Sequence, residues 1–194
     1  FEEGFDPGPR TVGVTAYPNA NLVVLSITFD TFAHGIGVAE GDVAVEGCEF
    51  ICGDQCGPAV WPQSAGNVVV GDCRFYGPWS EGVLVLGSGS ADLLVESCRF
   101  VGCGDGVAAQ SITNPSVRVI DCDFDDCSIV GISFSDGAAG EIRGNSVHGN
   151  PRVGIALVES GSVEVCDNHV EISGGAPRGI AFGLESHAGY LVTC

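Results

Sequence analysis

The chain has 194 residues, of which 45% are hydrophobic and 16% are charged, a balance that excludes intrinsic disorder and allows one substantial core. Its 25 acidic residues face only seven basic ones, and the net charge of -18 argues against nucleic acid and anionic membranes as partners. No apolar run approaches the roughly 20 residues that span a bilayer, so membrane insertion is not expected.

Residues 1–12 match no repeat and are expected to be a lead-in or part of a preceding coil. From residue 13 onward a six-residue motif recurs. Its clearest copies read V-x-x-C-x-F, and they are Val45–Phe50, Val70–Phe75, Val95–Phe100 and Val119–Phe124. The fourth position, here called the slot, is Ile27 in an earlier copy and Asn145, Asn168 and Cys194 in later copies. Successive slots lie 21 to 26 residues apart, so the repeat covers residues 13–194 and stops in mid-coil.

A second motif, a glycine followed by Ile or Val, repeats in phase with the first. Its copies begin at Gly35, Gly82, Gly106, Gly131, Gly154 and Gly179. Each copy predicts a turn followed by a short strand with alternating side chains. With the alternating pair upstream of each slot, one period holds three short strands and three turns. The sequence therefore predicts about seven coils of an all-β, single-stranded, right-handed parallel β-helix.

Stacking of the coils places equivalent side chains on in-register strands roughly 4.8 Å apart. The phenylalanines of the first motif should form one inward ladder and the slot residues another. Asn in the slot is expected to adopt left-handed backbone geometry and to bond its neighbours, whereas Cys gives a small apolar ladder. Outward residues such as Arg99 and Asp123 are expected to form ion pairs between coils.

These motifs resemble those of the right-handed β-helix proteins of the pectin-lyase-like superfamily. The resemblance implies polysaccharide binding along the Gly-Ile strand, where the enzymes carry Asp, Arg or Lys, often with Ca²⁺. In this chain the outward positions of that strand hold no ionisable residue. The residues there are Gly37, Leu84, Ala108, Ser133, Ala156 and Ala181. An acid–base pair is therefore not expected on this strand, which argues against catalysis in this segment.

Ten cysteines leave several pairings open. The slot cysteines, Cys194 among them, are expected to be buried free thiols. Cys103 and Cys127 stack in a second row and form either a disulfide or two thiols. Cys52 and Cys56 lie in one turn as C-x3-C, where a local disulfide and two free thiols are equally expected. Cys166 has no obvious partner.

Two groups of residues are candidate sites. Tyr76 and Trp79 offer exposed aromatic rings for stacking on sugars, with Asp54, Glu81, Asp105 and Asp125 in neighbouring turns; the alternative is that the rings pack over a loop. Asp136, Glu159 and Glu185 are almost one coil apart and predict a carboxylate row that holds calcium; the alternative is a solvated acidic edge.

The leading functional hypothesis is an extracellular or cell-surface module that binds or displays polysaccharide without catalysis in this segment. Two alternatives remain: a fragment of a polysaccharide lyase, glycoside hydrolase or uronate epimerase that acts on acidic polysaccharide, and a structural adhesin stalk. Because the chain begins without Met and ends in mid-pattern, neighbouring coils or domains of a longer chain are the expected partners.

Overall fold

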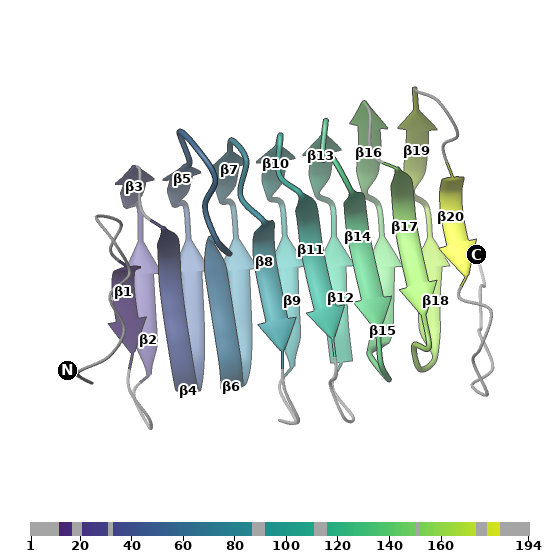
Figure 1. Cartoon of the computed structure of the whole chain (residues 1–194). Helices are drawn as coiled ribbons and strands as arrows, with labels where there is room; N and C mark the ends of the chain where they lie inside the picture. Colours follow the sequence, from purple (N-terminus) through teal and green to yellow (C-terminus); the bar gives the residue numbers. More distant parts are fainter. Residues whose placement is uncertain are drawn as a thin grey trace.

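A computed structural model describes residues 12–16, 21–30, 33–86, 92–110, 116–149, 152–173 and 178–182. The chain winds as a right-handed parallel β-helix with three strands in each coil (Figure 1). The described residues contain strands, turns and bends but no helix. The predicted fold class is therefore confirmed.

Three faces of stacked strands surround the core, and we name them in the order in which the chain visits them. Face A consists of β1 (Val12–Ala16), the first parts of β4 (His34–Glu46) and β6 (Val60–Gly71), then β8 (Glu81–Leu86), β11 (Asp105–Gln110), β14 (Val130–Ser135), β17 (Val153–Val158) and β20 (Arg178–Phe182).

Face B lies behind face A in Figure 1, and face C lies at its upper end. Face B consists of β2 (Leu22–Leu25), the second parts of β4 and β6, then β9 (Leu93–Glu96), β12 (Ser116–Ile120), β15 (Ala139–Arg143) and β18 (Val163–Cys166). Face C consists of β3 (Thr28–Asp30), β5 (Glu49–Ile51), β7 (Arg74–Tyr76), β10 (Arg99–Val101), β13 (Asp123–Asp125), β16 (Ser146–Gly149) and β19 (His169–Ile172).

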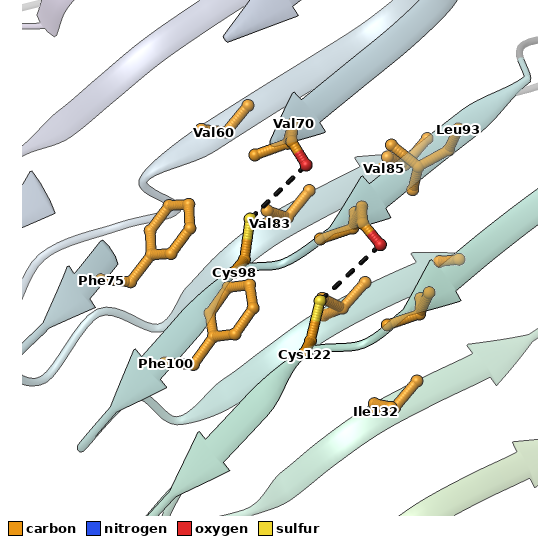
Figure 2. Close-up of a cluster of buried hydrophobic side chains, with 14 of the residues drawn as sticks. Val60, Val70, Phe75, Val83, Val85, Leu93, Cys98, Phe100, Cys122 and Ile132 are labelled. Atoms are coloured by element: carbon orange, nitrogen blue, oxygen red, sulfur yellow. Dashed lines mark hydrogen bonds between the residues drawn. The ribbon is translucent and has the colours of Figure 1, made fainter. Parts of the chain in front are cut away.

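The phenylalanine ladder on face C sets the register of the coils. Phe29, Phe50, Phe75, Phe100 and Phe124 are paired in sequence, followed by Val147 and Val170. Neighbouring rings are almost parallel, with centroids 4.6–4.9 Å apart. The five rings are at most 3% exposed, so they form one continuous apolar stack through the core (Figure 2 shows Phe75 and Phe100).

The glycines of face A are in phase with this ladder because the rings occupy the space beside them. A Cβ atom added to Gly35 would overlap the ring of Phe50, and one added to Gly106 would overlap the ring of Phe124. In one coil the equivalent residue is Ala59, which is fully buried. The glycine motif is therefore a packing requirement rather than a functional signal.

The slot residues tie each coil to the one before it. The thiol of Cys98 donates to the carbonyl of Val70 at 3.5 Å, and Figure 2 shows this bond and the equivalent one from Cys122. Asn145 Nδ2 donates to the carbonyl of Val119 at 2.9 Å, while its Oδ1 accepts the backbone N–H of Cys122 at 3.0 Å. Cys and Asn therefore supply the same donor, and Asn adds an acceptor.

The expectation of left-handed backbone geometry at the slot is wrong. This geometry occurs one residue before the slot. The residues with positive φ are Ser26, Gly47, Asp72, Ser97, Asp121, Gly144 and Asp167. Ser, Asp and Gly tolerate this geometry, and the tight turn between faces B and C requires it. The slot side chain is consequently free to point into the core.

The cysteines fall into two classes. Cys52 and Cys56 form a disulfide, which decides between the two local alternatives. The slot cysteines Cys48, Cys73, Cys98 and Cys122 are buried free thiols, as are Cys103, Cys127 and Cys166. Contact with Cys122 and burial raise the pKa of Cys98, so its thiol stays protonated. Cys194 lies outside the described residues.

We expect Asn145→Leu to lower the free energy of unfolding by roughly 2–4 kcal/mol, since it leaves the N–H of Cys122 and the carbonyl of Val119 without partners. Asn145→Cys keeps a donor for the carbonyl of Val119 and should cost about half as much. Urea unfolding followed by circular dichroism measures both variants. Equal losses for Leu and Cys would contradict the role given to the slot hydrogen bonds.

Candidate functional site

The outward row of face A contains one aromatic residue that the repeat pattern concealed. The strand pairings place Gly37 beside Trp61, and Leu84, Ala108, Ser133, Ala156 and Ala181 continue the row. Trp61 is half-buried, whereas Leu84 and Ala108 are buried. Trp61 therefore rises from a row of small and aliphatic residues.

A second row begins face A at the corner with face C, and it carries ionisable side chains. The pairings place Glu81, Asp105, Val130, Val153 and Arg178 in successive coils, and the register of Ile36, Val60 and Val83 puts Pro58 one coil and His34 two coils before Glu81. Glu81 and Asp105 are direct partners on neighbouring strands, which lie roughly 4.8 Å apart in a sheet. The fold thus brings two carboxylates together at the edge of the row that holds Trp61.

Asp105 is held in an unfavourable environment for an ionised carboxylate. Its Oδ1 is buried without a hydrogen-bond partner. Burial, and then the charge of Glu81, raise the pKa of Asp105 to about 6, against a partial opposing effect of the Val130 backbone. Glu81 differs because its Oε2 accepts a hydrogen bond from the Ser80 hydroxyl at 2.5 Å.

His34 and Trp61 also present polar atoms without partners. Their rings lie with centroids 5.8 Å apart, and the imidazole packs over Gly57. His34 Nδ1 and Trp61 Nε1 are both buried and unpaired. An unpaired buried polar group costs about 1–3 kcal/mol, so these atoms of face A are candidates for contact with a ligand: His34 Nδ1 and Trp61 Nε1 together, and Asp105 Oδ1 in the third coil after His34. We call His34, Trp61, Glu81 and Asp105 the face A site.

A surface pocket of about 290 Å³, which we call the turn pocket, adjoins the face A site. It is lined by Gln55, Cys56, Pro78, Trp79, Ser80, Gly102, Gly104 and Ser128. Ser80 and Gly104 directly precede Glu81 and Asp105, so the two features are continuous along the chain. The lining has no charged side chain, and the Cys52–Cys56 disulfide holds one wall.

The structure separates the sequence-predicted ligand residues. Trp79 is only 1% exposed, and its ring packs edge-on against Phe50 at 6.5 Å, so the expectation of an exposed ring is wrong for Trp79. Tyr76 is half-buried on face C, outside the lining of the turn pocket. Asp105 lies in the face A site, and its role in binding stays a prediction.

The predicted calcium row lies at the opposite end of the face A strands. Asp136 and Glu159 are exposed and occupy equivalent turns, where both have positive φ. Glu185 lies outside the described residues. No group of three potential metal ligands occurs within the part of the chain that the structure describes. Calcium binding by this row therefore stays a prediction.

The expected ion pairs occur on face C. Arg99 contacts Asp123 and Asp125 at 3.5 and 3.6 Å, and His148 contacts the same two carboxylates at 2.8 and 3.2 Å. These groups are partly exposed, so each pair contributes at most about 1 kcal/mol. The charged side chains of face C are therefore paired with one another in contact with solvent, and they do not indicate a ligand site.

The repeat pattern missed Trp61 because its coil has Ala59-Val60 where the other coils have Gly followed by Ile or Val. A search for the whole period, rather than for the glycine, would have placed Trp61 in the outward row. His34 was missed because it belongs to no ladder of like residues.

Comparisons with known proteins support the fold and leave the function open. The family model described as "Right handed beta helix region" matches residues 12–171. No curated protein and no solved structure matches the chain. The described residues contain no helix long and apolar enough to cross a membrane.

We expect Asp105→Asn to stabilise the protein at high pH. A carboxyl whose pKa is raised on folding destabilises the folded protein once it ionises. Replacing it with Asn should therefore raise the free energy of unfolding by roughly 1–2 kcal/mol near pH 8, allowing for solvent screening, and should have no effect near pH 4. Thermal unfolding at both pH values measures it, with the exposed Glu96→Gln as the control. A loss of stability near pH 8 would show that the carboxylate makes a stabilising contact.

Proposed function

Because this chain belongs to the right-handed β-helix family, we propose that it is an extracellular or cell-surface module that binds polysaccharide along face A. Binding, rather than catalysis, is the role that the face A site supports best. The single observation that carries the proposal is the half-buried Trp61 in a row of small and aliphatic residues, beside His34, with Trp61 Nε1 and His34 Nδ1 both lacking a partner in the protein.

Sugar hydroxyls match the unpaired atoms of the face A site. Trp61 Nε1 is a donor, a carboxylate oxygen of Asp105 is an acceptor, and a hydroxyl group serves both. The side chains of His34, Trp61 and Asp105 are half-buried, so part of each side chain is accessible to a ligand. The indole face offers an apolar platform against which a sugar ring packs.

The long, straight row of strands suits a polymer. Face A continues through neighbouring coils roughly 4.8 Å apart, and its outward row beyond Trp61 is small or aliphatic. The uncharged lining of the turn pocket adds hydroxyl and amide groups at one side.

Charge argues against acidic polysaccharide as the ligand. The net charge of -18 and the carboxylates of the face A site repel uronate polymers. The disulfide between Cys52 and Cys56 supports an oxidising, extracellular setting, since such bonds persist there. Burial protects the free thiols in that setting.

Trp61→Ala should weaken binding of a responsive oligosaccharide by about 10- to 100-fold, the usual effect of removing an aromatic anchor. A glycan array identifies the oligosaccharide, and isothermal titration calorimetry measures the affinities. Leu94→Ala, a half-buried outward residue on face B, is the matched control and should have little effect. Equal affinities of the wild type and Trp61→Ala would place the binding surface elsewhere.

One observation favours hydrolysis as a second candidate function. Asp105 has a pKa of about 6 beside Glu81, and a protonated carboxyl next to a second carboxylate is the pair that glycoside hydrolysis requires. If the chain hydrolyses the polysaccharide that it binds, Asp105→Asn and Glu81→Gln should each lower the release of reducing ends at least 100-fold. Undiminished release in both variants would exclude this pair.

A further inference from the structure

The carboxylate pair of the face A site has no cationic side chain directly beside it in its row, and this narrows the chemistry of the ligand that it fits. Glu81 and Asp105 are partners on neighbouring strands. Among the described residues, the positions that flank this pair in the same row are Pro58 and Val130, which are uncharged. Two adjacent carboxylates without a counter-ion repel each other, and a cation between them would remove the repulsion.

From this juxtaposition we propose that the face A site recognises the protonated amino groups of an amino-sugar polymer, with an ammonium group between Glu81 and Asp105. The inference rests on the proposed polysaccharide-binding function and names the class of polysaccharide. An ammonium group supplies three donors, one of which satisfies the unpaired oxygen of Asp105. Charge-assisted hydrogen bonds of this kind are stronger than neutral ones.

Two further observations fit a cationic sugar. Trp61 is half-buried on the same face, and an indole ring attracts a cation as well as an apolar sugar face. The net charge of -18 attracts a polycation at long range.

The groups around Asp105 set the conditions for the test. They are Glu81 on β8, Cys103 in the preceding turn and the uncharged Val130 on β14. Asp105 ionises above a pKa of about 6. At about pH 6.5 most of the carboxyl is therefore ionised, while an amino group that titrates like an α-amino group is still protonated.

The experiment compares a hexamer of β-1,4-linked glucosamine with its fully N-acetylated counterpart, which differs in charge but not in backbone. Calorimetry near pH 6.5 and about 0.15 M salt should show at least a 10-fold preference for the glucosamine hexamer. Asp105→Asn and Glu81→Gln should each reduce that preference toward one. Glu96→Gln, which removes the same charge from an exposed position at the end of β9, should leave it unchanged.

The possible outcomes separate this inference from the proposed function. If the N-acetylated hexamer binds as tightly as the glucosamine hexamer, or if Asp105→Asn keeps the preference, the inference is overturned while polysaccharide binding stands. If Glu96→Gln reduces the preference as much as Asp105→Asn does, the preference comes from the net negative charge of the whole protein rather than from the face A site. The inference is then likewise overturned. If no oligosaccharide of any class binds, both proposals fall.

Discussion

The vertical register of the coils is the constraint on which the rest of the structure depends. One coil cannot bury its own apolar side chains, so each must present the same inward positions as its neighbours. The stacked rings from Phe29 to Phe124 meet this demand on face C, and glycines such as Gly106 leave room for the rings on face A. The slot hydrogen bonds then link successive coils, through thiols in the first part of the helix and through Asn145 and Asn168 in the last part.

Because the interior determines the register, the outward positions are free to vary from coil to coil. Most of face A uses that freedom for small or aliphatic residues. The exceptions fall in successive coils: Glu81 and Asp105 are direct partners, and Trp61 lies in the coil before Glu81, level with Leu84. The unpaired oxygen and the raised pKa of Asp105 show that its ionised carboxylate destabilises the folded protein, although the packing of the core does not require a carboxylate there. A cost of this kind, kept at one place on a regular scaffold, is typical of a binding or catalytic site.

The fold was predictable from sequence because the two motifs are set by the same packing and therefore recur in phase. The state of Cys103 was not predictable, since stacking brings it near Cys127 in either case. The site was harder to predict. The burial of Trp79 depends on how its turn packs against Phe50, which no repeat position records. Trp61 escaped notice because its coil replaces the glycine with Ala59. The pairing of Glu81 with Asp105 follows from the repeat, since they directly precede Gly82 and Gly106, but the repeat does not record the buried, unpaired oxygen of Asp105.

The central claim is that the register assembles a sugar-binding surface on face A, and nuclear magnetic resonance tests it most directly. Titration of ¹⁵N-labelled protein with the glucosamine hexamer should shift the indole N–H signal of Trp61 and the backbone signals of Glu81 and Asp105. The signals of Leu94 and Arg118, on the outward row of face B, should not move. Shifts confined to face B or face C, with the Trp61 signal unchanged, would contradict the account.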